Sequence, residues 1–349
     1  MKKRISLLLL VTIILISATG CAQKDSSMGL TNVNSTETVD DKDKSIYVEG
    51  EGYPKKVYDF IKSETIIEEP FERAAVLSGT PLNIWYDLEG KSVCSSDVSD
   101  NVKLIPEYED EIRNLPQIGP VYSINMEAVI EQQPDLIVAQ VGTQSTEAKK
   151  LKDMGFNVIT THIRGFNDVI DTYEAFGKIL EKEDLAKERI DKLVSEKEKL
   201  QKLSPKNDDT AVILYISGNT MAAKLDNSIA GDVLNILDVK NIASDLPPDK
   251  IGSEHTPLDV EYIVEKNPTY VFVTSMLPSN EEAKKSMEKE FEKNPVWQGI
   301  DAIKEDRVIY LPQEYFLFNA GPYYTEAIEY MARSIYPEIY GEVDGWYGK

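Results

Sequence analysis

The sequence predicts an α/β protein of two similar lobes, each with a central, mostly parallel sheet flanked by helices, joined by one long α-helix. Three observations predict this fold. A helix–strand unit occurs twice, 134 residues apart. Short apolar runs alternate with amphipathic segments, as in parallel sheets with helical crossovers. A long, charged stretch without proline separates the two copies of the unit.

The first 20 residues have the three parts of a secretory signal. Met1–Arg4 is basic, no charge occurs from Ile5 through Gly20, and small residues precede Cys21. A transmembrane helix is the alternative, but spanning takes roughly 20 apolar residues and this run thins into Ser17–Gly20 too early. We therefore expect residues 1–20 to be a cleaved signal peptide.

Residues 21–50 are polar and nearly free of large apolar groups, so they are expected to form a flexible linker. Loss of residues 1–20 removes three cations and moves the formal charge from -22 to -25. Such an acidic surface argues against nucleic acid and against flat adsorption to anionic lipid.

Both lobes are predicted from strand-like runs. The N-terminal lobe is expected over residues 51–166 and the C-terminal lobe over residues 206–349. The expected strands lie within 73–79, 135–139 and 156–161 of the first lobe and within 210–218, 269–273 and 306–312 of the second. Chance similarity between two common helix–strand units is the alternative to a true repeat.

The repeated unit is Ile124–Ala139 in the first lobe and Leu258–Val273 in the second. Each copy has an amphipathic helix that a proline ends, followed by a continuous apolar run. The matched positions are Glu127 with Glu261, Glu131 with Glu265 and Pro134 with Pro268. The two copies therefore predict the same local structure.

Residues 167–205 are expected to form a helical connector. The stretch Phe166–Leu203 contains no proline and a single glycine, Gly177. From about Asp184 an apolar stripe predicts a helix of roughly 20 residues, about 30 Å long at 1.5 Å per residue. A coiled coil is the alternative, but the repeat covers too few heptads. A stiff strut between two lobes is the better interpretation.

Three segments carry a resemblance to a known family. These are "GYPKKVYDFIKSETIIEEPFERAAVLSG" from Gly52, "IGPVYSINMEAVIEQQPDLIVA" from Ile118 and "GPYYTEAIEYMARSIYPEIY" from Gly321. Their order and spacing resemble the solute-binding lipoproteins of ABC importers for ferric siderophores, haem or cobalamin, from about Tyr53 to Tyr340. The resemblance implies a non-enzymatic monomer without a cofactor. It further implies a ligand cleft between the lobes, modest hinge motion, a small-molecule chelate as ligand and an importer permease as partner.

The resemblance also implies an anchor and two docking residues. Thr19-Gly20-Cys21 resembles a lipobox, with Ala18 where leucine is more common, so lipid on Cys21 would tether the chain outside the membrane. An ordinary secreted protein is the alternative. Cys94 would then be unpaired, so no disulfide framework is expected.

For permease docking, Glu147 matches the acidic position of the N-terminal lobe. Asn235 stands where the C-terminal lobe often has glutamate, so Asp232 or Asp238 is the substitute there. Paired charges of this kind steer encounters more than they add affinity. The alternative role for Glu147 is a favourable carboxylate in the first turn of a helix.

Ligand-binding residues are expected on turns beyond the carboxyl ends of the strands. Aromatic faces there suit planar or catechol-like ligands, and an arginine suits an anionic one. The candidates are Thr80, Trp85, Tyr122, Gln144 and Arg164 on the first lobe and Asn219, Met221, Tyr315 and Phe316 on the second. Core packing is the alternative for Trp85, and a solvated loop charge is the alternative for Arg164.

Other functions stay open. Direct zinc or manganese binding is disfavoured because only His162 and His255 exist, although carboxylates could add ligands. Haem would need an axial ligand, for which the candidates are Tyr122, His255, Met276 and Tyr315. A surface hydrolase is disfavoured because the sequence has no Gly-x-Ser-x-Gly, His-Glu-x-x-His or phosphate-loop motif. A lipoprotein that senses or scavenges its ligand without a permease is the remaining alternative.

Overall fold

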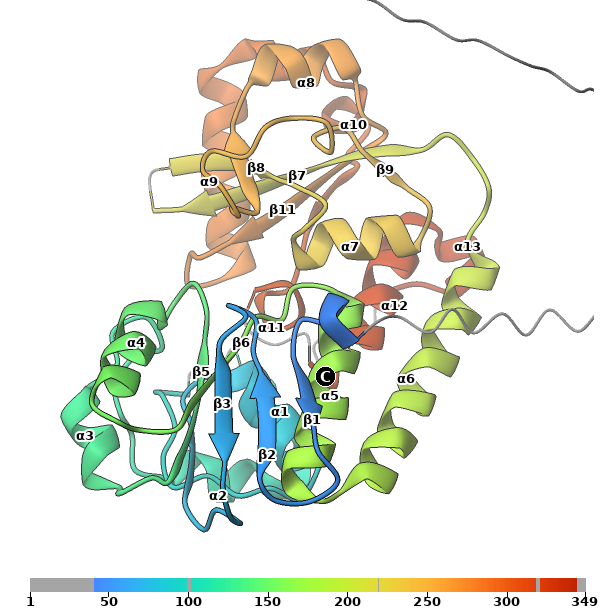
Figure 1. Ribbon diagram of the computed structural model, residues 1–349. Coiled ribbons are helices and arrows are strands. Elements are labelled where there is room, and N and C mark those ends of the chain that lie inside the picture. Colours follow the sequence, from blue (N-terminus) through green and yellow to red (C-terminus); the bar gives the residue numbers. More distant parts are fainter. Residues whose placement is uncertain (1–40, 99–101, 219, 318–320, 344–349) are drawn as a thin grey trace, which may run out of the picture. The chain divides into compact units, whose positions relative to one another are not determined.

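The computed structural model describes residues 41–98, 102–218, 220–317 and 321–343, which belong to one compact unit (Figure 1). The predicted signal peptide, Cys21 and Asn219 lie outside the described residues. The order of elements is α/β, with sheets that helices flank, as the sequence predicts.

The N-terminal sheet consists of β4 (Ala74–Val76), β5 (Leu136–Gln140) and β6 (Val158–Thr161), which pair in that order and run parallel. Nearly every residue of the three strands is buried, which explains why the runs read as continuously apolar. The helices around this sheet are α1 (Gly79–Asp87), α2 (Glu109–Arg113), α3 (Met126–Glu131) and α4 (Ser145–Asp153), with 3₁₀ turns at Asp41–Asp43 and Pro106–Tyr108.

A separate antiparallel sheet precedes β4. Its strands are β1 (Tyr47–Glu49), β2 (Lys55–Tyr58) and β3 (Glu64–Ile67). It is tied to the rest of the protein where the Thr65 hydroxyl donates to the Val158 carbonyl at 2.9 Å. The expected linker boundary at residue 50 is therefore wrong, because β1 pairs with β2 and the Ser45 amide donates to Asp171 at 2.7 Å.

The C-terminal sheet is mixed, with the order β10-β8-β7-β11-β12 and with β9 also paired to β7. Strand β11 runs parallel to β7 and β12, whereas β8 runs antiparallel to β7 and β10. Its strands are β7 (Thr210–Ser217), β8 (Thr220–Lys224), β9 (Lys240–Asn241), β10 (His255–Pro257), β11 (Tyr270–Ser275) and β12 (Val308–Tyr310). The segment after Gly218, expected as a ligand-facing turn, therefore continues as β8.

Helices also flank the C-terminal sheet. They are α7 (Ile229–Ile236), α8 (Val260–Lys266), α9 (Asn280–Lys293), α10 (Asp301–Lys304), α11 (Gln313–Phe316), α12 (Tyr324–Ile335) and α13 (Pro337–Tyr340), with a 3₁₀ turn at Pro295–Gly299. The repeated unit has the same start in both copies. Asn125 caps α3 and Asp259 caps α8, because each side chain accepts backbone N–H groups of the first turn.

The connector contains two helices, and the helix expected from about Asp184 is confirmed as the second of them. Helix α5 spans Phe166–Leu180 and α6 spans Glu183–Leu203, and Glu181 between them is left-handed with φ 57°. The two helices pack closely because Gly177 has no side chain: a Cβ there would lie 2.5 Å from Ala186 Cβ. Helix α5 packs on α1 and β1, so α6 alone leads from the N-terminal sheet to β7 (Figure 1).

One apolar cluster contains buried side chains from both halves of the compact unit. It combines Trp85 and Phe176 from the N-terminal half with Phe272, Tyr324 and Ile328 from the C-terminal half, and all five are fully buried. Relative movement of the halves would disturb these buried contacts. The close packing therefore favours small hinge motions over large ones.

Candidate functional site

Arg164 bridges the two halves at the carboxyl end of β6. Its guanidinium Nη1 donates to the Gly252 carbonyl, across the junction in the C-terminal half, at 3.2 Å. Its backbone N–H donates to Asp168 at 2.9 Å. The side chain is half-buried, and this burial lowers the pKa of Arg164 from its ordinary value, while the Glu254 carboxylate opposes that shift. A guanidinium remains ionised at neutral pH, so the junction holds a fixed positive charge.

On the other side of the junction, Lys224 and Glu254 form an ion pair at 3.1 Å. Lys224 is 3% exposed, and its ammonium lies 5.0 Å from the centre of the Tyr215 ring. Burial alone would raise the pKa of Glu254, but the adjacent Lys224 outweighs it and holds that pKa below its ordinary value. The His255 ring stacks on Tyr215 with centroids 4.6 Å apart.

The chain's two histidines both belong to this junction. The His162 ring lies 4.3 Å from the Phe60 ring, and burial, followed by the Arg164 charge, lowers the pKa of His162 to about 4. Burial and then Lys224 also lower the pKa of His255. Within the described residues, His162 Nδ1 and His255 Nε2 are buried and have no hydrogen-bond partner. Both imidazoles are neutral at pH 7, so the charged groups that face one another here are those of Arg164, Lys224, Glu254 and Asp168.

Two predicted ligand residues of the N-terminal half lie in the protein interior. Trp85 is fully buried, its indole N–H donates to the Lys91 carbonyl at 3.1 Å, and its ring meets Phe176 edge-on. Gln144 is also fully buried, because its amide donates to the Leu77 carbonyl at 2.7 Å and its oxygen accepts from the Gln140 amide. Neither side chain is accessible in this structure, which favours the core alternative for Trp85 and leaves the ligand contact of Gln144 a prediction.

The predicted aromatic pair of the C-terminal half is buried as well. Phe316 is 1% exposed and packs against the Tyr330 ring. Tyr315 is 4% exposed, and its hydroxyl donates to Glu326 at 2.7 Å. Both rings belong to the apolar cluster shared by the halves, and their contact with a ligand stays a prediction.

The remaining candidates are more accessible or differently placed. Tyr122 is 70% exposed, whereas Thr80, in the first turn of α1, is 7% exposed. Met221 is half-buried on β8 and packs on the C-terminal core. Only Tyr122, Arg164 and Met221 among the described candidates therefore keep more than a small exposed fraction.

The two predicted docking residues have different surroundings. Glu147 is half-exposed in the first turn of α4. Asp232 on α7 is engaged within the chain, because it accepts hydrogen bonds from the Phe166 amide at 2.9 Å and from the Tyr324 hydroxyl at 2.5 Å. It is therefore a structural residue rather than a free docking carboxylate. The alternative, Asp238, pairs with Lys206 at 2.5 Å.

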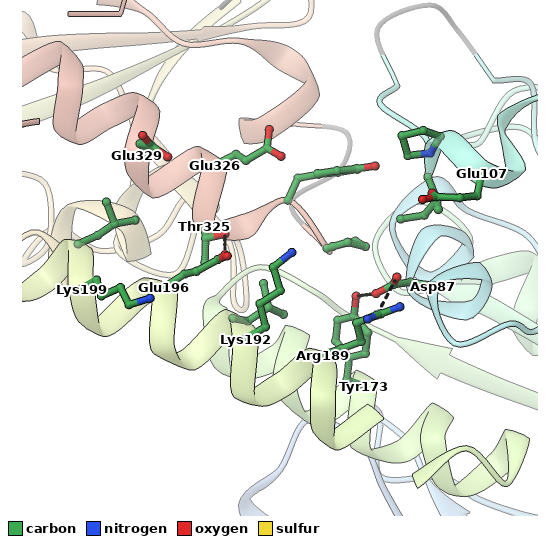
Figure 2. Close-up of a pocket in the computed structure, with 16 residues that line it drawn as sticks. Asp87, Glu107, Tyr173, Arg189, Lys192, Glu196, Lys199, Thr325, Glu326 and Glu329 are labelled. Atoms are coloured by element: carbon green, nitrogen blue, oxygen red, sulfur yellow. Dashed lines mark hydrogen bonds and ion pairs between the residues drawn. The ribbon is translucent and has the colours of Figure 1, made fainter. Parts of the chain in front are cut away.

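Sequence reasoning missed a pocket of about 640 Å³ on the inner face of α6 (Figure 2). Its walls come from the end of α1, the turn at Ile105–Glu107 and the start of α12. No predicted ligand residue lines it. The only available signal was the cationic face of α6, which is equally typical of a solvated helix.

The fold, with a parallel N-terminal sheet, a mixed C-terminal sheet, a small antiparallel sheet and a connecting helix, is that of the periplasmic type of binding protein. The sequence pattern of the family described as "Periplasmic binding protein" matches residues 75–315, and the chain belongs to this family. The family includes binding proteins of ABC importers for siderophores, haem and cobalamin, so the resemblance seen in the motifs is confirmed. Family membership also confirms that the chain is a binding protein and not an enzyme.

The chain is similar to particular members of the family. It is 25% identical over 312 residues to the Bacillus subtilis "Uncharacterized ABC transporter substrate-binding lipoprotein YvrC". This alignment covers 87% of this chain and 92% of that protein. The chain is 21% identical to the B. subtilis "Fe(3+)-citrate-binding protein YfmC", which covers 86% of each chain. The solved structure of Staphylococcus aureus IsdE complexed with heme has a TM-score of 0.64 at 22% identity, and covers 75% of this chain and 97% of that one.

The described ranges contain neither a membrane-spanning helix nor a cluster of metal-binding side chains. No helix there is both long and apolar enough to cross a bilayer. Nor do three or more His, Cys, Asp or Glu side chains gather there in an arrangement that could hold a metal ion.

Proposed function

We propose that this protein is an extracytoplasmic lipoprotein that captures an iron chelate and presents it to the permease of an ABC importer. A ferric siderophore is the first choice of ligand, and haem or cobalamin is the second. Membership of the family supports the role, and the similarity to proteins named for ferric citrate and solved with heme supports iron chelates as the ligand class.

The observation that carries the proposal is the position of Arg164. It lies where the carboxyl ends of the N-terminal strands meet the C-terminal half, which is where open α/β sheets bind ligands. Within the described residues its guanidinium makes one hydrogen bond, to a neutral carbonyl, and so retains donors for an anionic oxygen of a chelate. A charge-assisted hydrogen bond of this kind contributes about 1.5–3 kcal/mol.

The aromatic and apolar groups of the ligand would contact side chains at the rim of the same junction. Tyr122, in the turn before α3, and Met276, directly after β11, are 70% and 42% exposed. Exposed aromatic and thioether groups offer adaptable apolar contact. This arrangement suits a chelate that combines an apolar body with acidic oxygens.

Anchoring and docking complete the proposal. Lipid on Cys21 and a polar linker would hold the receptor beside its importer. Glu147, half-exposed on α4, would meet a cationic side chain of the permease. Asp232 has no part in docking here because its carboxylate is occupied within the chain.

The test is a direct binding titration of the soluble chain from residue 22 onward. Ferric citrate, a ferric hydroxamate, a ferric catecholate, haem and cobalamin are titrated separately, with free Zn²⁺ and Mn²⁺ as controls. Saturable, submicromolar binding of one chelate class supports the proposal and assigns the ligand. Binding of a free ion alone favours a metal receptor, and folded protein that binds none of the chelates contradicts the proposal.

A further inference from the structure

The pocket of about 640 Å³ is separate from the Arg164 junction, and no proposed function accounts for it (Figure 2). Three parts of the chain form it. Asp87 and Ile105–Glu107 come from the N-terminal half, and Pro322–Glu329 comes from the C-terminal half. One face of α6, from Arg189 to Leu200, forms the floor. An occupant would therefore contact both halves and the helix that connects them.

Most of the acidic side chains in the pocket already have partners. Glu326 accepts from Lys103 and from the Tyr315 hydroxyl, at 2.5 and 2.7 Å. The other paired acids are Asp87 with Tyr173 and Arg189, Glu196 with Thr325, and Glu329 with Arg333. Glu107, at the rim, is exposed to water. Asp87, Glu326 and Glu329 are therefore each neutralised by a cation of the chain, whereas Glu196, whose partner is a neutral hydroxyl, and Glu107 keep their charge.

Two cations on the floor are not neutralised in this way. Lys192 and Lys199 are exposed, and within the described residues neither ammonium has a hydrogen bond or an ion pair. Figure 2 shows the Lys192 side chain extending from α6 into the pocket. The two residues are seven apart on one helix, so they lie on the same face and about 10.5 Å apart along its axis.

Apolar side chains lie close to these two cations. Leu193 and Leu200 are on the same face of α6, and Pro322 and Tyr323 form the facing wall. The Tyr323 hydroxyl donates to the Leu104 carbonyl at 2.8 Å, which fixes the ring in place. A ligand that satisfies all of these groups has an apolar middle and an acid group towards each end.

We propose that this pocket binds a small organic dianion of the linear dicarboxylate class, with one carboxylate at Lys192 and the other at Lys199. Its methylene chain packs between Leu193 and Tyr323. The proposal goes beyond chelate capture, because it assigns a second ligand site that Arg164 does not line.

The test is calorimetric titration of the chain from residue 22 onward with succinate, adipate, suberate and sebacate. Octanoate serves as the single-acid control. The expected result is binding that depends on diacid length, and that is at least about tenfold tighter for the best diacid than for octanoate. High salt should weaken it, since both acid contacts are ionic.

Variants locate the site. Lys192→Ala and Lys199→Ala should each weaken diacid binding about fivefold or more, and the matched variant Lys202→Ala, an exposed α6 lysine outside the pocket, should leave it unchanged. All three are surface changes that leave the fold intact. Absence of binding by any diacid up to about 1 mM, or equal binding by the wild-type chain and the Lys192→Ala variant, would overturn the proposal.

Discussion

Replacing Asp232 by alanine should destabilise the fold rather than change docking. The Asp232 carboxylate accepts hydrogen bonds from the Phe166 amide, at the start of α5, and from the hydroxyl of Tyr324, on α12. Tyr324 is fully buried, and burial, followed by the Asp232 charge, raises its pKa well above the ordinary value. The hydroxyl therefore stays protonated and needs an acceptor at every accessible pH.

The expected loss follows from the groups left behind. A buried hydroxyl or amide without a partner costs about 1–3 kcal/mol. Removing a carboxylate from the start of α5 costs about 0.3–1 kcal/mol more, because helix N-termini favour negative charge. Since the Phe166 amide is only part-buried and water can replace its partner, we expect Asp232→Ala to lower the free energy of unfolding by about 1–4 kcal/mol.

Urea denaturation followed by far-UV circular dichroism measures this loss. Asp245→Ala is the matched control, because its carboxylate is 83% exposed and should change stability by less than about 0.5 kcal/mol. A double-mutant cycle with Tyr324→Phe isolates the hydrogen bond, with an expected coupling of about 0.5–3 kcal/mol. A stability change as small as that of the control, or zero coupling, would refute the reasoning.

Three further predictions concern buried groups. Cys94 is fully buried, and burial raises its thiol pKa to about 12. Iodoacetamide should therefore modify it at least about 100-fold more slowly in the native chain than in urea. Peptide mass spectrometry measures both rates, and equal rates would contradict its burial. Gly177→Ala should lower the free energy of unfolding by about 1–3 kcal/mol, because the new Cβ would lie 2.5 Å from that of Ala186. Helix propensity alone predicts the opposite, a higher urea midpoint. That result would show that α5 and α6 are less closely packed. For His162, whose pKa falls from the ordinary 6.5 to about 4, the unfolded chain binds more protons between those values, so the free energy of unfolding should fall as pH drops through that window. His162→Gln should reduce this pH dependence of the urea midpoint, and an unchanged slope would count against a neutral, buried imidazole.

Strands β4, β5, β6, β7 and β11 could be predicted because burial on both faces leaves a direct mark on the sequence. The runs around Ala74–Val76, Leu136–Gln140 and Tyr270–Ser275 are apolar at nearly every position, and only a covered strand needs that pattern. The repeat was equally visible, because a cap, an amphipathic helix and a proline recur at the same spacing.

Elements that depend on distant contacts were not visible in the sequence. Strand β1 lies in a polar segment and is held by pairing with β2 and by the Asp171 contact to Ser45. The start of a helix near Asp184 was expected, but the left-handed residue before it was not, because Glu181 is neither glycine nor proline. This break between α5 and α6 is held by tertiary contacts, among them the Lys55 ammonium, which donates to the Lys178 carbonyl at 2.6 Å. Such contacts override local propensity.

The candidate site was only partly predictable for a related reason. A residue just beyond a strand end can face either solvent or the core, and its place in the sequence does not tell which. Arg164 is of the first kind, whereas Gln144 and Phe316 are of the second. The pair Lys224–Glu254 was missed because it depends on the pairing of β8 with β10, which no periodicity indicated.

The central claim is that an iron chelate binds at the junction that Arg164 bridges. The most direct measurement is the dissociation constant of the chelate that binds best, compared between the wild-type chain and Arg164→Ala. Arg113→Ala is the control, since Arg113 pairs with Glu109 on α2, outside the junction. We predict that Arg164→Ala raises the dissociation constant about ten- to 100-fold and that the control leaves it unchanged. Equal affinity of the wild-type and Arg164→Ala chains would contradict the account.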